Sequence, residues 1–349
     1  LTVANTSNVF SVGASEIKGE ATVNATTFNV NGNLTVTNDT DAQLIVGTNT
    51  ATMTVDGNTT INYFADIYAK NFTTTGAFTL GNEAVVDIYN TTTSMSIGSD
   101  LTLANGTAGT FDSVMNIDVN GTLTIGGNVS VGTDAKLTIG KNTNTTVGGN
   151  TTVKDTLNIN GNYIATGNLT IEEGAKVVGA KGEIKFDGNA TVDGSLTTNG
   201  KFTSGELTIG TKGGATFDEK SDVVINGDVL VKSEFVTGTT CAGTLDVKGN
   251  FKTTGDLTIG DGAAINISGA NTTVEVGGDT TIGKDVSNLV DSTGVNITAH
   301  TFNNTGTFSI DDVDVGPQYW RMAETVSENT HLAISWESLI NRRHLGLVV

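Results

Sequence analysis

The chain has 349 residues and a formal net charge of −19, from 37 acidic and 18 basic residues. This excess of negative charge repels nucleic acids and anionic membranes, so we expect neither as a partner. Thr (61), Gly (44), Asn (36) and Ser (19) dominate the composition, and only 6% of the residues are aromatic. Such usage is unlike that of a compact enzyme domain, whereas 37% hydrophobic and 16% charged residues argue against a disordered chain.

The lack of a long apolar stretch and the cysteine count exclude further classes. No stretch approaches the roughly 20 apolar residues that a membrane-spanning helix needs. The chain opens at Leu1 without an initiator Met, as a processed or excerpted protein would. Cys241 is the only cysteine, which excludes an internal disulfide framework and a multi-cysteine metal site. We expect Cys241 to be buried as a small apolar residue.

Short strands are predicted along most of the chain. The recurring unit is an apolar-Thr-apolar triplet beside Gly or Asn, which places the apolar pair on one face of a strand and Thr on the other. It occurs at residues 123–125, 137–139, 169–171, 207–209 and 257–259. Triplets with another middle residue occur at 157–159, 245–247, 265–267 and 274–276. The apolar pairs are expected to line a core, with the middle residues facing solvent.

Gly-Asn, Asn-Gly, Gly-Asp and Gly-Gly pairs separate these triplets. Such pairs supply the positive φ values that tight corners demand, so we expect a corner about every five to ten residues. Before residue 320, β-branched residues and Gly interrupt every window long enough for a helix. The sequence therefore predicts an all-β protein.

A longer period favours a solenoid over stacked sandwiches, which also bury alternating strands. One series has gaps of 21 to 25 residues and two double gaps of 39: Asn33, Asn58, Asn82, Asn105, Asn128, Asn150, Asn189, Asp228, Asn250, Asn271 and Asn296. The pair Gly167-Asn168 also returns as Gly255-Asp256, an offset of 88, or four periods of about 22. We predict a right-handed parallel β-solenoid over residues 1–310, with three short strands per turn.

The amino-acid composition changes after residue 310, and residues 311–349 are predicted to form a separate C-terminal tail. All three Arg, both Trp and the only Pro lie there. The tail is either a cap on the last turn or an arm that reaches another subunit. Aromatic and Arg side chains dominate protein interfaces, so the candidate assembly residues are Trp320, Arg321, Trp336, Arg342 and Arg343.

Eighteen of the 36 Asn residues lie in Asn-X-Ser/Thr sequons, the acceptor pattern for N-glycosylation. The candidate sites are Asn33, Asn58, Asn71, Asn90, Asn105, Asn128, Asn150, Asn168, Asn189, Asn271 and Asn296. Two interpretations stay open. Either the surface is coated with glycans, or the sequons arise because a corner Asn precedes a strand with an outward Thr.

No catalytic set emerges from the sequence. The three His residues at 300, 331 and 344 are too few and too scattered for a metal cluster or a Ser-His-Asp triad. We expect neither enzymatic activity nor a required cofactor. Asp311, Asp312 and Asp314 form a candidate Ca²⁺ site, because hard cations take several oxygen ligands, with a solvated loop as the alternative.

The units Gly32-Asn33-Leu34-Thr35-Val36 and Gly255-Asp256-Leu257-Thr258-Ile259 resemble the repeats of two groups. The first comprises β-solenoid surface proteins of prokaryotes, meaning adhesin and autotransporter passengers and the subunits of surface layers, sheaths and extracellular filaments. The second is the fibrous repeats of phage tail fibres. The resemblance covers about residues 20–310 and implies a structural or adhesive role outside the cell.

The sequence thus favours a structural extracellular protein that assembles with copies of itself into a filament, a sheath or a surface layer. Open solenoid ends template the stacking of further strands, and outward Thr and Asn ladders add lateral hydrogen bonds. The alternative is an adhesive fibre, an adhesin passenger or phage tail fibre, that binds surface glycans. The third is a polysaccharide-active β-helix enzyme, which would need a carboxylate-lined groove.

Overall fold

The computed structural model describes residues 1–3, 9–37, 39–105, 113–236, 239–267, 272–283, 296–297, 301–304 and 308–310. These residues contain β-strands and no helix, which confirms the all-β prediction. The chain divides into two compact units, Leu1–Phe186 and Asp187–Val349, which we call unit 1 and unit 2.

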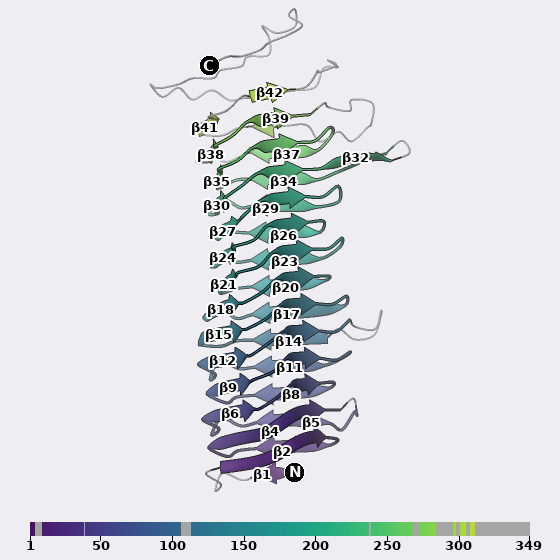
Figure 1. Ribbon diagram of the computed structural model, residues 1–349, viewed down its shortest axis with the longest axis vertical. Coiled ribbons are helices and arrows are strands. Elements are labelled where there is room, and N and C mark those ends of the chain that lie inside the picture. The colour runs from purple at the N-terminus through teal and green to yellow at the C-terminus, as the bar shows by residue number, and fades with distance from the viewer. Residues whose placement is uncertain are drawn as a thin grey trace, which may run out of the picture. The chain divides into compact units, whose positions relative to one another are not determined.

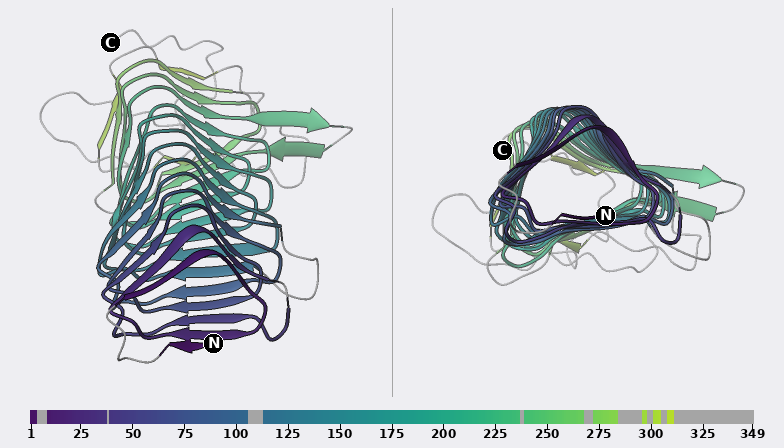
Figure 2. Two further views of the ribbon diagram at one scale, coloured as in Figure 1. Left: turned by 60° about the horizontal axis from the view of Figure 1, so that its bottom comes forward. Right: turned by 90° about the horizontal axis from the view of Figure 1, so that it is seen from below.

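Unit 1 is a parallel β-solenoid whose turns each pass through three strands, one on each of three faces (Figures 1 and 2). Face 1 comprises β1 (Thr2–Val3), β3 (Glu20–Val23), β5 (Gln43–Val46), β8 (Phe64–Ile67), β11 (Val85–Ile88), β14 (Ser113–Ile117), β17 (Ala135–Ile139), β20 (Thr156–Ile159) and β23 (Lys176–Gly179). Face 2 comprises β6 (Thr52–Val55), β9 (Asn71–Thr74), β12 (Ser94–Ile97), β15 (Gly121–Ile125), β18 (Thr143–Val147), β21 (Asn162–Ala165) and β24 (Glu183–Phe186). Face 3 comprises β7 (Thr59–Ile61), β10 (Phe78–Leu80), β13 (Leu101–Leu103), β16 (Val129–Val131), β19 (Thr151–Val153) and β22 (Leu169–Ile171). The longer β2 (Val9–Ile17) and β4 (Thr27–Val36) each run through faces 2 and 3.

Unit 2 repeats this arrangement. Its face 1 comprises β26 (Ser195–Thr198), β29 (Gly214–Phe217), β34 (Thr244–Val247), β37 (Ala264–Ile267) and β40 (Asn296–Ile297). Face 2 comprises β27 (Lys201–Ser204), β30 (Asp222–Ile225), β35 (Asn250–Thr253), β38 (Thr273–Val276) and β41 (Thr301–Asn304). Face 3 comprises β25 (Ala190–Val192), β28 (Leu207–Ile209), β31 (Val229–Val231), β36 (Leu257–Ile259), β39 (Thr280–Ile282) and β42 (Phe308–Ile310).

Successive turns pair in parallel with equivalent residues in register. Leu101 pairs with Val129, and Val129 pairs with Thr151. The solenoid has about 12 turns spaced about 21 residues apart, which confirms the predicted fold class and period. Sandwich packing is excluded for the described turns, because their ladders are parallel and run from each turn to the next.

The apolar-Thr-apolar triplet has the orientation that its alternation predicts. Leu169 and Ile171 on β22 are fully buried, and Thr170 between them is half-buried on the outside. Burying one such aliphatic side chain stabilises the fold by about 1.5–3 kcal/mol. Larger side chains also fill the core, as in the aromatic series Phe202, Phe217 and Phe251, with successive ring centroids 5.8 and 6.0 Å apart.

Most corner glycines are required because successive turns stack closely, and not because of the positive φ that the sequence predicts. Among the described glycines, only Gly32, Gly121, Gly174 and Gly262 have a positive φ. At most of the other glycines the limit is the approach of the preceding turn: a Cβ on Gly167 would overlap the Oδ1 of Asn150 and lie 2.6 Å from the backbone of Gly149. The predicted corners are present, but close stacking of turns rather than left-handed backbone selects Gly at most of them.

The Asn series that suggested the period is only partly right. Asn33, Asn58, Asn128, Asn150, Asn189 and Asp228 occupy one corner, immediately before a face 3 strand. The gap of 39 from Asn189 to Asp228 does hold two turns, with Glu206 at the intervening corner. Asn82, Asn105 and Asn250 occupy other positions in their turns, Asn296 opens β40, and Asn271 lies outside the described residues. Asn is frequent enough in the sequence to supply false members of the series.

Unit 2 also contains an antiparallel hairpin between β31 and β34. It consists of β32 (Ser233–Val236) and β33 (Thr239–Ala242), which form a sheet of their own and project from the solenoid wall (Figures 1 and 2). Cys241 lies on β33 and is half-buried, so the expectation that it is a buried core residue is wrong. Inserting ten residues between two faces accounts for the long 28-residue interval from Val229 to Leu257.

Candidate functional surfaces

A ladder of hydrogen bonds runs along the corner before face 3. The side-chain oxygen of Asn or Asp in one turn accepts a hydrogen bond from the backbone N–H at the same corner of the next turn. In unit 1 the bonds join Asn33 to Asn58 (2.9 Å), Asn58 to Ala77 (2.9 Å), Asp100 to Asn128 (2.6 Å), Asn128 to Asn150 (2.8 Å) and Asn150 to Asn168 (2.8 Å). In unit 2 they join Asn189 to Glu206 (2.9 Å), Asp228 to Asp256 (2.8 Å) and Asp256 to Asp279 (2.8 Å). The ladder satisfies these corner N–H groups with a side chain, so the corner Asn has a structural role.

The position of this ladder accounts for six of the 18 sequons. In Asn168-Leu169-Thr170 the Asn occupies the corner, Leu169 points into the core and Thr170 points outward two residues after Asn168. Six candidate glycosylation sites occupy this corner, and their side chains are all exposed: Asn33, Asn58, Asn128, Asn150, Asn168 and Asn189. Glycosylation at these positions stays a prediction. A glycan attaches to the amide nitrogen, whereas the ladder uses the amide oxygen.

The other candidate sites lie elsewhere in the turn. Asn71 opens β9 and is half-buried, and its Nδ2 donates to the backbone oxygen of Ala51 (3.3 Å). Asn90 and Asn105 are exposed beyond the ends of β11 and β13. The side chains of Asn271 and Asn296 lie outside the described residues.

Face 3 presents an outward column of mostly hydroxyl side chains in each unit. The column consists of Glu16, Thr35, Thr60, Thr79, Thr102, Ser130, Thr152 and Thr170 in unit 1, and of Thr191, Thr208, Leu230, Thr258 and Thr281 in unit 2. Face 2 of unit 1 is likewise uncharged on β15, where Thr122 and Thr124 point outward. Face 2 of unit 2 is charged, with an ion pair between Lys252 and Glu275 (2.8 Å). Hydrogen-bonding groups thus repeat at the spacing of the turns, about 4.8 Å.

An aromatic and acidic cluster lies on face 1 of unit 1 and at its edge. The rings of Tyr68 and Tyr89 stack with centroids 4.0 Å apart, and the Tyr89 hydroxyl donates to Oδ1 of Asp66 (3.0 Å). Burial raises the pKa of Asp66, the Tyr89 hydrogen bond lowers it, and the neighbouring Asp87 raises it. The hydrogen bond with Tyr68, together with burial, raises the pKa of Tyr89. Phe64 points outward on the same strand as Asp66. The cluster therefore combines apolar rings with hydrogen-bond acceptors.

Several candidates fall outside the part of the chain that the structure describes. They are the Ca²⁺ candidates Asp311, Asp312 and Asp314, the assembly candidates Trp320, Arg321, Trp336, Arg342 and Arg343, and the tail boundary at residue 311. Among the described residues, no group of three or more His, Cys, Asp or Glu side chains could hold a metal ion. None of these residues forms a helix long and apolar enough to cross a membrane.

No protein-family model, curated protein or solved structure matches the chain. The roles of the surfaces described above are therefore inferred from the residues of this chain alone.

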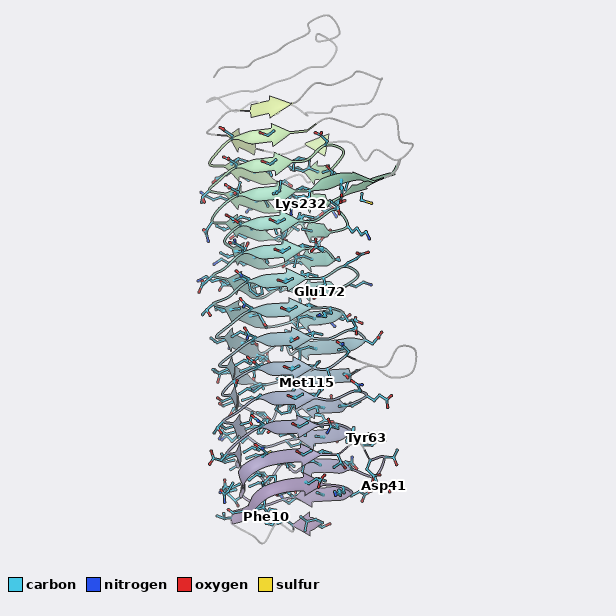
Figure 3. The ribbon with its side chains drawn as sticks, turned by 45° about the vertical axis from the view of Figure 1, so that its right-hand side comes forward. Phe10, Asp41, Tyr63, Met115, Glu172 and Lys232 are labelled. Carbon is cyan, nitrogen blue, oxygen red and sulfur yellow. The ribbon has the colours of Figure 1, made fainter. Side chains whose placement is uncertain are left out.

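Sequence reasoning missed the hairpin and the face 1 cluster. The signal for the hairpin was a break in period, because residues 233–242 contain no apolar-Thr-apolar triplet and interrupt the regular corners. The signal for the cluster was that three of the five Tyr residues, Tyr63, Tyr68 and Tyr89, fall within 27 positions. Tyr63, which is labelled in Figure 3, lies immediately before β8 in the sequence.

Proposed function

We propose that this protein is a structural extracellular subunit that assembles with copies of itself into a filament, a sheath or a surface layer. The observation that carries the proposal is the outward column of face 3, which presents Thr or Ser at all of its described turns except those of Glu16 and Leu230. A surface that repeats with the turns fits another surface with the same repeat. Thr and Asn ladders of this kind form lateral hydrogen bonds between stacked β-structures.

The exposed corner Asn residues extend this proposal to a glycosylated surface. The ladder hydrogen bond engages the amide oxygen of these residues and not Nδ2, the atom that would carry a sugar, although Nδ2 donates to Asp100 in Asn128 (3.2 Å) and to Glu206 in Asn189 (3.0 Å). Asn58 and Asn150 illustrate this arrangement, because each is exposed and accepts a ladder hydrogen bond through Oδ1. Glycans at such corners would coat the outside of the assembled structure.

A second function, adhesion to surface glycans, is favoured by the face 1 cluster. The Tyr68 and Tyr89 rings offer apolar contact, and Asp66 and Asp87 offer acceptors for sugar hydroxyl groups. Adhesion would suit a fibre that ends on a receptor, such as an adhesin passenger or a phage tail fibre. Glycan-array binding that is lost in Tyr68→Ala would support this second function.

Electron microscopy of the purified protein, with intact mass on the same sample, tests the main proposal. We expect regular polymers, and a mass above 35.9 kDa per chain if the sequons are occupied. Discrete slender trimers at the unmodified mass would replace the main proposal with the adhesive fibre.

A further inference from the structure

The β32–β33 hairpin has two outer edges without a partner. Ser233 pairs with Ala242 and Glu234 pairs with Cys241, and within the described residues neither strand joins a third. The hairpin leaves the wall directly after Lys232 (Figure 3). A two-stranded ribbon alone is marginally stable in water, and an unpaired edge is a template for another strand. The hairpin therefore offers a contact that no strand in the described part of the chain fills.

The hydrogen-bond pattern shows which backbone groups point outward. The N–H of Gly243 donates to the carbonyl of Lys232 (2.8 Å), so these two residues form a hydrogen-bonded pair at the base of the hairpin. Antiparallel pairs alternate between hydrogen-bonded and non-hydrogen-bonded, which makes Glu234 and Cys241 the next hydrogen-bonded pair. Thr240 and Ala242 then direct their N–H and C=O groups away from β32, to the outer edge of β33.

We propose that β33 pairs with β33 of a second copy of this chain, antiparallel and about a twofold axis at Cys241. Thr240 of each copy then forms a hydrogen-bonded pair with Ala242 of the other. Cys241 faces Cys241 of the second copy in the non-hydrogen-bonded position between them, where Cα atoms lie about 4.5 Å apart. That distance is within the range of about 4.4–6.8 Å that a disulfide spans. This inference rests on the proposed self-assembly and supplies a specific contact for it.

Charge favours β33 over β32 as the contact edge. The same twofold pairing of β32 would place Glu234 opposite Glu234, and like charges directly opposite each other destabilise a ladder. Glu234 on β32 and Lys232 directly before it are both exposed, so this side of the hairpin carries charged side chains. All four residues of β33, Thr239–Ala242, are uncharged. The half-buried Cys241 is the only cysteine of the chain, so it reports on this contact without engineering.

Oxidative crosslinking of the full chain tests the proposed register. Copper-phenanthroline in air forms the disulfide: each thiol loses one proton and one electron, and copper passes the two electrons to dissolved oxygen. We expect a covalent dimer of twice the 35.9 kDa chain mass. The matched control is Cys241→Ser with Glu234→Cys, which moves the thiol to the exposed neighbour on β32. We expect the control to crosslink about tenfold more slowly, because only Cys241 meets its copy at the disulfide distance. Equal rates, or no crosslink at Cys241, would overturn the proposal.

Proline substitutions give a second test without crosslinking. Thr240→Pro removes an outward N–H from β33 but no hydrogen bond within the hairpin, because Thr240 and Phe235 form a non-hydrogen-bonded pair. Phe235→Pro removes the equivalent N–H from the outer edge of β32 and is the matched control. We expect Thr240→Pro to weaken dimerisation about tenfold or more, and Phe235→Pro to leave it unchanged. Equal effects of the two variants would contradict pairing through β33.

The two tests separate this contact from the proposed function. Large assemblies that form equally well with Thr240→Pro, and without a Cys241 crosslink, would exclude the hairpin contact and leave self-assembly standing. A crosslinked dimer that never grows further would support the hairpin contact and remove the filament or layer.

Discussion

Gly47 is expected to be required because Asn24 of the preceding turn occupies the space of a side chain. A Cβ at Gly47 would overlap Oδ1 of Asn24 and lie 2.8 Å from its Cγ, and the three nearest atoms all belong to that side chain. Gly47→Ala should cost about 1–2 kcal/mol, typical of overpacking. In an Asn24→Ala background the same substitution should be neutral or slightly stabilising, by about 0.4–1 kcal/mol, because φ at Gly47 is not positive. The expected coupling energy, the difference between these two effects, is about 1–3 kcal/mol.

The matched substitution is Gly98→Ala, whose Cβ would overlap the carbonyl oxygen of Thr75 and lie 2.8 Å from its carbonyl carbon. Because the Thr75 carbonyl belongs to the backbone and cannot rotate away as a side chain can, Gly98→Ala should lower the free energy of unfolding by about 3 kcal/mol. Gly19→Ala is the control, because nothing lies within 4 Å of its Cβ. Urea unfolding by circular dichroism, with hydrogen exchange to locate the change in unit 1, measures all of these variants. Steric overlap is refuted as the cause if Gly47→Ala destabilises the Asn24→Ala background as much as the wild type, or if Gly98→Ala destabilises the fold no more than Gly19→Ala does.

Five further substitutions test the turns, the core and the charges of unit 1. Glu83 has a φ of 63°, so Glu83→Gly should stabilise the fold by about 0.5–1 kcal/mol, and Gly174→Ala (φ of 81°) should destabilise it by about 1 kcal/mol. A destabilising Glu83→Gly or a stabilising Gly174→Ala in urea unfolding would contradict this. Leu169→Ala should cost about 3 kcal/mol and Thr170→Ala less than about 0.5 kcal/mol, and similar costs would show that the alternation is wrong. The raised pKa of Asp66 means that the folded state holds this proton more tightly, so the group contributes stability at low pH that is lost as pH rises through the folded pKa. Asp66→Asn should therefore stabilise by about 0.5 kcal/mol at pH 7 and have no effect near pH 3, whereas an equal effect at both pH values would refute the assignment.

The fold could be predicted because each turn repeats the same physical solution. Alternation in triplets such as Leu169-Thr170-Ile171 determines which residues enter the core, and stacking of equivalent turns converts that alternation into a period. The 88-residue offset between Asn168 and Asp256 predicted the period correctly because these two residues occupy equivalent corners. The Asn series failed at Asn82 and Asn250, because composition alone does not distinguish one corner of a turn from another.

The surfaces were harder to predict because they depend on contacts between turns. A sequence shows that Asn and Gly are adjacent, but not that the oxygen of Asn150 lies against Gly167 of the next turn. The stack of Tyr68 and Tyr89 is also invisible until a register of 21 residues brings the two rings together. The hairpin carries no repeat, so its pairing across Cys241 had no periodic signal.

Sedimentation velocity over a wide range of protein concentration tests the central claim most directly. Self-assembly predicts a weight-average mass that rises with concentration well beyond the 35.9 kDa of one chain. A single species of one chain mass at every concentration would contradict it.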